Sequence, residues 1–454
     1  MLLLGGMAVA QKSFEELPEQ DHAVLARVSQ WQDLKFGLMV HWGIYSQKGI
    51  VESWSICPEE WVPREKKWSM DYVHEYWTLS KRFNPTKFKA EQWTKAAKNA
   101  GMKYMVMTAK HHDGFCMFNT EETDFNIVKS GFGRDVIGEV VNACKKDSLW
   151  SGIYFSKPDW HHSDYWTTQL EVKDRNVKYN PEKYPDKWQN FCDYTYNQVR
   201  ELTHNYGDID ILWLDGEWVR PEWSLDEQSR LMLGENGWVQ DIGMPHIATM
   251  ARDENEDLLI VDRSVHGRYE NYRILEKEIP NRVLPYPWEA CMTIGDSWSY
   301  RPNDNYKSAT KLIHILVDVV AKGGNLLLNV GADAKGYLPL EALDVMSEMG
   351  IWLQENGEAI YNTRPYKHAV ENNWRFTQSK DGDHMYMIYL VPEGYDNETI
   401  NEVLPIYAKE WAQLKVLAGG KIENHRGEPY LLQIPSGKNR HAVVVDCTRR
   451  GIKK

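Results

Sequence analysis

The stretch IDILWLDG, residues 209–216, decides the fold class of this chain. Its apolar residues have the length of a buried strand, and the run ends at the carboxylate of Asp215, followed by a glycine. Residues 188–206 before it have apolar side chains at helical spacing, which predicts the order helix, turn, strand, carboxylate. In an α/β barrel the carboxyl ends of the strands form the active-site face, so we expect Asp215 to face a pocket. A carboxylate held there can act as a nucleophile or stabilise a developing positive charge.

The same unit of helix and strand recurs along the chain. Helices predicted over 90–100, 135–145 and 309–321 lead into apolar strands at 104–108, 152–156 and 325–331, and further strands are predicted at 36–40 and 258–261. Such alternation is typical of a parallel sheet covered on both faces. The predicted strands end at polar residues: His41, His111, His112, Asp215, Arg263 and Asn329. Only a barrel converges all its strand ends on one mouth, so we predict an α/β fold of the (β/α)8-like TIM-barrel type.

The pattern changes after about residue 357. A predicted helix at 339–355 closes the barrel, and short strands follow at 384–391, 411–417, 430–434 and 441–446, between turns rich in Gly, Pro, Asn and Asp. This pattern predicts a small antiparallel β-sandwich. We therefore expect a catalytic barrel over residues 11–356 and a C-terminal β-sandwich over residues 357–454.

The composition restricts the class of partner. The chain has 454 residues and a formal net charge of -12, and an acidic surface argues against binding to nucleic acid or to anionic membranes. The 20 Trp and 24 Tyr suit a carbohydrate-binding protein, although a large aromatic core explains them equally well. The six cysteines form no C-x-x-C pair, so no zinc or redox motif is indicated. The oligomeric state stays open.

The first residues, MLLLGGMAVAQ at 1–11, form a short apolar run that ends in Ala-x-Ala, as a secretory signal does. No basic segment precedes the run, so we interpret residues 1–10 as the remnant of a truncated signal peptide. We expect an exported, periplasmic protein; the alternative is an apolar N-terminus with no targeting role. No other run is long and apolar enough to span a membrane.

Two chemistries compete for the polar strand ends. In the first, histidines bind the hydroxyls of a sugar and Asp215 attacks its anomeric carbon. In the second, His41, His111, His112 and Asp113 ligate a metal in a barrel hydrolase. Adjacent His111 and His112 point to opposite sides of a regular strand, and no His-x-His spacing occurs, so we expect no metal and no cofactor. A purely structural role for each histidine is the third alternative.

A retaining glycosidase also needs a second carboxyl group, about 5–5.5 Å from the nucleophile, as general acid and base. Four glutamates follow Arg263 and are candidates for this role: Glu270, Glu276, Glu278 and Glu289. Spacing alone does not choose among them.

Six motifs make the chain resemble the α-L-fucosidases of glycoside hydrolase family 29. They are FGLMVHWG (36–43), FNP (83–85) with Trp93, TAKHHDGF (108–115), WLDG (213–216), PWE (287–289) and GGNLLLNVG (323–331). The HHDGF and GGNLLLN blocks together are highly specific. The resemblance implies a barrel with a C-terminal β-sandwich, and a retaining exo-α-L-fucosidase that removes terminal fucose from oligosaccharides or other fucosylated glycans.

The resemblance also implies roles for single residues. Asp215 matches the family nucleophile, and the residues that match the fucose pocket are His41, Trp54, His111, His112, Tyr154 (or its neighbour Phe155), Trp213 and Arg263. Many relatives carry Thr-Pro-Glu about a dozen residues after the arginine. Here Ile274-Leu275-Glu276 stands in that place, so Glu276 is assigned as the acid/base and Glu289 is the reserve. An α-L-galactosidase, whose substrate adds a hydroxyl at C6, and a non-catalytic sugar-binding relative are the alternatives.

Overall fold

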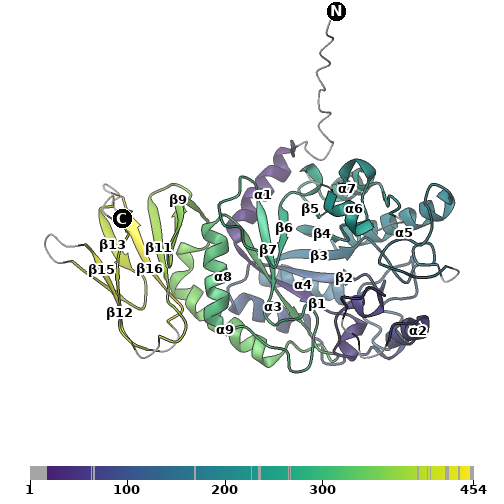
Figure 1. Ribbon diagram of the computed structural model, residues 1–454, viewed down its shortest axis with the longest axis horizontal. Coiled ribbons are helices and arrows are strands. Elements are labelled where there is room, and N and C mark those ends of the chain that lie inside the picture. The colour runs from purple at the N-terminus through teal and green to yellow at the C-terminus, as the bar shows by residue number, and fades with distance from the viewer. Residues whose placement is uncertain are drawn as a thin grey trace, which may run out of the picture.

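A computed structural model describes residues 18–449, apart from positions 63, 65–66, 168–169, 226, 234–236, 264, 266, 396–397, 406, 409–410, 425–428 and 438–439 (Figure 1). The expected signal segment, residues 1–10, therefore lies outside the described residues. In the part of the chain that is described, no helix combines the length and the apolar character needed to cross a membrane.

Eight parallel strands form one sheet in the order β5-β4-β3-β2-β1-β8-β7-β6. Their bounds are β1 Phe36–His41, β2 Tyr104–Lys110, β3 Trp150–Ser156, β4 Ile211–Asp215, β5 Leu259–Asp262, β6 Arg273–Glu276, β7 Trp288–Thr293 and β8 Asn325–Gly331. The predicted TIM-barrel class is confirmed. The sequence pattern does not predict β6 and β7, because one is a short edge strand and the other has a glutamate inside its apolar run.

The strand ladder leaves a seam between β5 and β6, the two ends of the sheet order. On this side β5 contacts the segment that precedes β6: an isolated antiparallel bridge joins Val261 to Glu270, and Asn271 N donates to Ile260 O at 2.9 Å. In the described part of residues 263–287 there is a short 3-10 turn, Gly267–Tyr269, and no α-helix. Arg263 directly follows β5 and Glu276 ends β6, so these two residues belong to the strands on either side of the seam.

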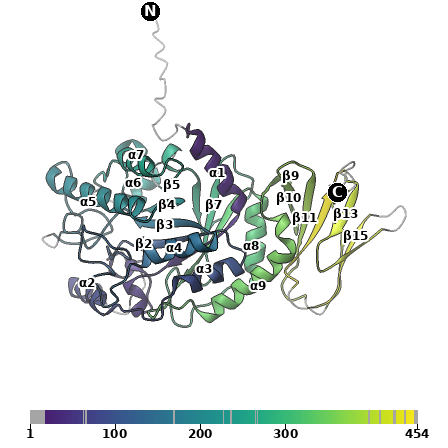
Figure 2. The same cartoon turned by 180° about the vertical axis from the view of Figure 1, so that it is seen from behind.

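Helices cover the outside of the barrel (Figures 1 and 2). They are α1 His22–Leu34, α2 Met70–Trp77, α3 Ala90–Asn99, α4 Val136–Asp147, α5 Pro185–His204, α6 Glu227–Leu233, α7 Met244–Glu254, α8 Ala309–Ala321 and α9 Leu340–Asn356. Local signals set their ends: the side chain of Asp135 accepts from Gly138 N at the start of α4, and Ser308 caps α8 through Lys311 N. The bounds of α8 are those predicted from its apolar spacing.

The barrel interior is filled with side chains below the active-site face. Gly37 on β1 leaves room for the Tyr104 ring, since a Cβ atom at Gly37 would lie 2.5 Å from that ring. Tyr104, Tyr154 and Trp213 belong to this interior cluster and are almost fully buried. The space open to a ligand is therefore at the carboxyl end of the strands.

Two antiparallel sheets follow the barrel. The larger has the order β13-β16-β11-β10-β9 and the smaller β12-β15-β14. Their bounds are β9 Thr363–Glu371, β10 Trp374–Ser379, β11 His384–Leu390, β12 Ile400–Val403, β13 Gln413–Val416, β14 Lys421–Glu423, β15 Leu431–Ile434 and β16 Ala442–Thr448. Side chains of both sheets, such as Phe376 and Leu432, share one buried cluster, and this confirms the predicted C-terminal antiparallel fold.

Helices α8 and α9 lie between the barrel and these sheets in both views (Figures 1 and 2). Helix α8 contacts β9, β10 and β16. On α9, Trp352 Nε1 donates to Ala442 O at 2.9 Å, and on α8 the Nε2–H of His314 donates to His441 O at 2.7 Å. The C-terminal sheets therefore pack on the helices behind β8, away from the strand ends that form the site.

Candidate active site

A cavity of about 460 Å³ opens at the carboxyl ends of the strands. Every residue that the sequence assigned to the site lines this cavity, except Glu289: His41, Trp54, His111, His112, Tyr154, Trp213, Asp215, Arg263 and Glu276. They come from the ends of β1 to β6 and from the loop after β1. The barrel thus gathers side chains that are up to 235 positions apart in the chain, the span from His41 to Glu276.

Asp215 ends β4 with its side chain 15% exposed. The Tyr154 hydroxyl donates to Oδ2 at 2.5 Å, and Arg263 NH1 donates to Oδ1 at 3.2 Å. Burial alone would raise the pKa of this carboxyl, but the Arg263 guanidinium and the other polar neighbours overcome it and lower the pKa to about 2. Asp215 is therefore ionised and held in a fixed orientation, as a nucleophile requires.

Glu276 ends β6, and its side chain is 41% exposed. Its Oε2 accepts from Arg263 NH2 at 2.9 Å. One guanidinium group thus bonds to both Asp215 and Glu276 across the seam between β5 and β6. Two carboxylates joined in this way can flank a single sugar ring.

A third carboxylate, Glu217, shares the same guanidinium. It forms an ion pair with Arg263 NH2 and lines the cavity. Burial raises the pKa of Glu217, and the nearby Asp215 carboxylate adds to the effect although Arg263 opposes it. Glu217 is not among the residues predicted from the sequence. Its place two residues after the strand-ending Asp215 was the available signal.

The hydrogen bonds of two histidines fix their tautomers. The Asn329 amide donates to Trp298 O at 2.7 Å, so its Oδ1, which lies 2.6 Å from His41 Nδ1, accepts a hydrogen from that ring. The Ser156 hydroxyl donates to Pro158 O at 2.6 Å, so Ser156 Oγ accepts from His112 Nδ1 at 2.7 Å. Both imidazoles therefore carry their hydrogen on Nδ1 and keep a lone pair on Nε2.

Burial keeps these rings neutral. It lowers the pKa of His41 and of His112 to about 4, and it holds the pKa of His111 well below the usual value. A neutral ring with a free Nε2 lone pair accepts a hydrogen bond from a hydroxyl group. The His112 Nε2 lies 3.7 Å from Asp215 Oδ2, so a hydroxyl bound there would also meet the carboxylate.

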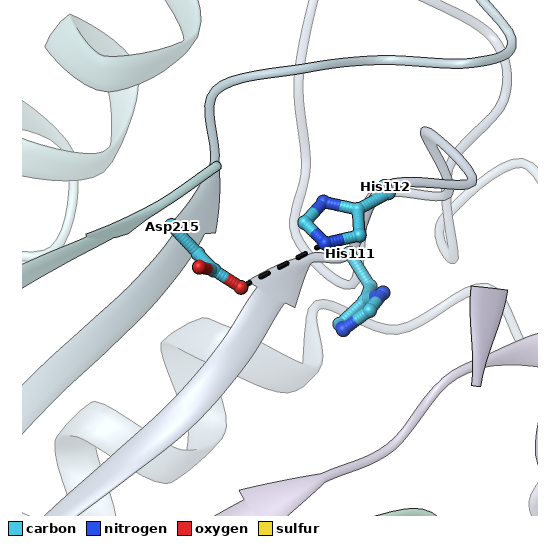
Figure 3. A group of neighbouring side chains, drawn as sticks. All are labelled: His111, His112 and Asp215. Atoms are coloured by element: carbon cyan, nitrogen blue, oxygen red, sulfur yellow. Dashed lines mark ion pairs between the residues drawn. The ribbon is translucent and has the colours of Figure 1, made fainter. Parts of the chain in front are cut away.

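His111 and His112 do not point apart, contrary to the expectation for a regular strand. Strand β2 ends at Lys110, and the two histidines lie in the turn beyond it, where both face the cavity beside Asp215 (Figure 3). Their ring centroids are 4.4 Å apart. The alternation of side chains applies within a strand and not in the turn that follows it.

These three residues also test the metal alternative. One ligand atom from each of His111, His112 and Asp215 lies within 4.8 Å of the others. The ligands of a tetrahedral zinc ion, at 2.0–2.1 Å from the metal, are separated by about 3.3 Å. The separation between His112 Nε2 and Asp215 Oδ2, 3.7 Å, is close to that value, so distance does not separate the two alternatives. Arg263 already balances the charge of Asp215, which favours hydroxyl ligands, and the absence of a metal stays a prediction.

Comparisons with known proteins identify the family of this chain. A family model described as Alpha-L-fucosidase matches residues 4–358. The chain belongs to the alpha-L-fucosidase family. An Alpha-L-fucosidase of Dictyostelium discoideum is 29% identical over 386 residues, which cover 80% of this chain and 78% of that protein. Plasma alpha-L-fucosidase of Homo sapiens is 29% identical over 349 residues, which cover 74% of this chain and 70% of that protein.

A solved structure supports the fold of this fucosidase-family chain along nearly its whole length. Alpha-L-fucosidase isoenzyme 1 from Paenibacillus thiaminolyticus superposes with a TM-score of 0.76 at 29% identity. The match covers 94% of this chain and 99% of that one. The C-terminal sheets are thus part of the shared architecture.

The reserve candidate, Glu289, lies away from the cavity of this family member. It is fully buried inside the barrel, where Tyr104 OH donates to Oε2 at 2.6 Å and Trp213 Nε1 donates to Oε1 at 3.3 Å. Burial raises the pKa of Glu289 to about 8. Its contacts hold Trp213 from below, whereas Glu276 faces the cavity itself.

Tyr154 and Phe155 are neighbours on β3, and their side chains lie on opposite sides of the strand. Tyr154 lines the cavity, and its ring lies 5.6 Å from His111 and 5.2 Å from Trp213 between centroids. Phe155 points the other way, where the Lys110 ammonium lies 4.2 Å from its ring centroid. The structure thus places the tyrosine, and not the phenylalanine, against the ligand space.

Glu52, two residues before Trp54 in the chain, is a further carboxyl group at the cavity. It is 3% exposed, and its Oε2 has no hydrogen-bond partner among the described residues. Burial raises its pKa to about 7, so near neutral pH the group is in part protonated. An unpartnered buried carboxyl oxygen is a costly feature that a bound hydroxyl would satisfy.

Proposed function

We propose that this protein is a retaining exo-α-L-fucosidase in which Asp215 is the nucleophile and Glu276 the acid/base. The observation that carries the proposal is the pairing of an ionised carboxylate at the end of β4 with a second carboxylate at the end of β6, through Arg263. Family membership supports the substrate class, terminal α-L-fucosyl residues on oligosaccharides or other glycans.

In the first step Asp215 Oδ attacks the anomeric carbon of fucose while the glycosidic C–O bond breaks. Glu276 donates its proton to the departing oxygen, and the product of this half-reaction is a glycosyl ester of Asp215. Arg263 balances the charge of Asp215 before attack and remains beside Glu276 after the proton has left.

In the second step the Glu276 carboxylate removes a proton from water. The water oxygen attacks the anomeric carbon, the ester bond to Asp215 breaks, and fucose leaves with its original anomeric configuration. The exposure of Glu276 gives it access to the incoming water.

The wall of the cavity favours the sugar in its transition state. His41 and His112 present lone pairs that accept from ring hydroxyls, and these contacts gain strength as positive charge develops on the ring. Trp54, whose ring lies 5.3 Å from His112, offers an apolar face to the C6 methyl group of fucose. An added hydroxyl at C6, as in L-galactose, would meet that apolar face.

The test is a panel of aryl α-L-fucoside and aryl α-L-galactoside with the wild-type protein, the product configuration being followed by NMR. We expect fast hydrolysis of the fucoside with α-L-fucose formed first, and slow hydrolysis of the galactoside. First release of β-L-fucose would refute the retaining mechanism. No turnover of either substrate would favour a non-catalytic sugar-binding protein, and a preference for the galactoside would change the substrate.

We also propose that the protein is exported to the periplasm and that its catalytic unit is residues 11–356, followed by a C-terminal domain at 357–454. The apolar run with Ala-x-Ala at residues 1–11 supports export. The end of α9 at Asn356 and the start of β9 at Thr363 support the division. Cell fractionation tests the first proposal, and limited proteolysis near residue 360 tests the second.

A further inference from the structure

Trp61 stands out at the mouth of the cavity. Among the described aromatic residues that line the cavity, it is the most exposed, with 57% of its surface accessible. Single exposed apolar residues are common on protein surfaces, so exposure alone does not mark a binding site. The contacts of Trp61 supply the further argument.

The ring of Trp61 is held in place by a charged clamp. Its Nε1 donates to Glu59 Oε2 at 2.6 Å. Glu59 in turn accepts two bonds from Arg175, one of them from Nε to Oε1 at 2.6 Å. The Arg175 guanidinium lies 4.7 Å from the Trp54 ring centroid and 5.1 Å from that of Trp218. An exposed indole is thus fixed to the same framework that positions the fucose pocket.

Trp61 lies on the solvent side of Trp54. The two indole centroids are 5.0 Å apart with an interplanar angle of 55°, so the rings form two facets of one wall. Trp54 is buried more deeply, between His112 and Trp160, whereas Trp61 is next to solvent. A ligand that fills the pocket and continues outward would pass from one facet to the other.

We propose that Trp61 is the stacking platform for the sugar to which the fucose is attached. This proposal rests on the proposed α-L-fucosidase function and names its substrate class: a fucosylated oligosaccharide whose adjoining residue is a pyranose with an apolar C–H face. The face of an indole ring is negatively polarised and attracts such C–H groups. Because the clamp orders Trp61 before the substrate arrives, binding does not have to immobilise the side chain.

The experiment compares two substrates that share the fucose and differ beyond it. One is a fucosyl disaccharide with a pyranose on the leaving side, and the other is α-L-fucosyl fluoride, whose leaving group is a single atom. For Trp61→Ala we expect kcat/KM for the disaccharide to fall about tenfold, equal to about 1.4 kcal/mol, with the value for the fluoride unchanged. Trp61→Phe keeps an aromatic face and should retain most of the activity on the disaccharide.

Two further variants sharpen the result. Glu59→Gln weakens the clamp without removing the ring, so we expect the same selective loss at a smaller size. Trp223→Ala removes another exposed tryptophan, 40% exposed and not among the residues that line the cavity, and should leave both substrates unaffected. Equal losses on both substrates for Trp61→Ala, or no loss on the disaccharide, would overturn the platform.

These outcomes are separate from a failure of the proposed function. A wild-type protein that does not hydrolyse α-L-fucosyl fluoride would refute the function itself. A wild-type protein that does hydrolyse it, with a Trp61→Ala variant whose kcat/KM changes by the same factor on both substrates, would refute the platform alone.

Discussion

The ends of β4 and β6 hold their carboxylates in different ways. Strand β4 pairs with a neighbour on each side, and Asp215 at its end is 15% exposed and bonded to Tyr154 and Arg263. Strand β6 is an edge strand that pairs with β7 alone, and Glu276 at its end is 41% exposed with Arg263 as its bonded partner.

The difference matches what the two steps demand of each group. A nucleophile must be ionised and aimed at one carbon atom, so it benefits from a strand fixed on both sides and from several donors. A proton donor that later activates water must exchange its proton and admit a water molecule, so it needs access to solvent. The seam between β5 and β6 supplies that access, close to β4, the strand that is paired on both sides.

The largest expected effect is that of substituting Asp215, at the end of the strand that is paired on both sides. Asp215→Ala removes the nucleophile, and we expect turnover of an aryl α-L-fucoside to fall by about a thousandfold or more. The melting temperature should change little, because Arg263 keeps Glu217 and Glu276 as partners. Near-normal activity of this variant would show that another group forms the covalent bond.

The second-largest expected effect is that of substituting Glu276, the more exposed of the two carboxylates. Glu276→Ala should slow hydrolysis less for a substrate with an activated aryl leaving group, since such a group needs no proton to depart. We expect added azide to restore the rate and to form a fucosyl azide of retained configuration, detected by NMR. Glu217→Ala and Glu289→Ala are the matched controls. Rescue of either one in place of Glu276→Ala would move the acid/base role to that residue.

The third effect is on the pH profile of kcat/KM. The pKa values of His41 and His112 are lowered to about 4, and that of Asp215 to about 2. As the pH falls through 4 the histidines gain a proton on Nε2 and lose the lone pair that accepts from the sugar, so kcat/KM should decline there. A profile that stays flat down to about pH 3 would show that the Nε2 atoms do not accept from the substrate.

The smallest expected effect is that of substituting Glu289, which lies below the cavity. Burial raises the pKa of Glu289 to about 8, so the folded protein holds a proton that the unfolded chain releases above about pH 4.3. Stability should therefore decrease as the pH rises from about 4.3 to about 8. Glu289→Gln keeps the shape of the side chain and should remove this slope in the melting temperature, with activity at pH 6 within about threefold of wild type. A large loss of activity would mean that Glu289 takes part in the chemistry.

The sequence predicted those parts of the fold in which one rule determines the structure. Buried strands such as β8 and the amphipathic helix α8 have clear periodicity, and their bounds agree with the predictions. Strand β6, with its pattern of partly exposed residues, has no such signal. The orientation of His111 and His112 was wrong for the same reason, because a strand rule was applied to a turn.

The site residues divide in the same way, into those that a sequence pattern predicts and those that it does not. Asp215 was placed by the strand that ends at it, and Glu276 by resemblance to a family motif. Glu217 and Trp61 lie in segments after a strand, where spacing does not predict which residues meet across the chain. Glu217 meets Arg263, and Glu59, the local partner of Trp61, meets Arg175, only when distant segments are folded together.

The gap in the ladder between β5 and β6 has a consequence for protein engineering. Strand β6 has a ladder partner on one side alone, whereas any change within 209–216 disturbs a strand paired on both sides. Libraries that aim to alter the accepted leaving group, or to favour transfer to a sugar over hydrolysis, should therefore conserve residues 209–216 together with Arg263 and Glu276. They should vary the other cavity-lining residues beside Glu276, such as Ile274 and Lys277.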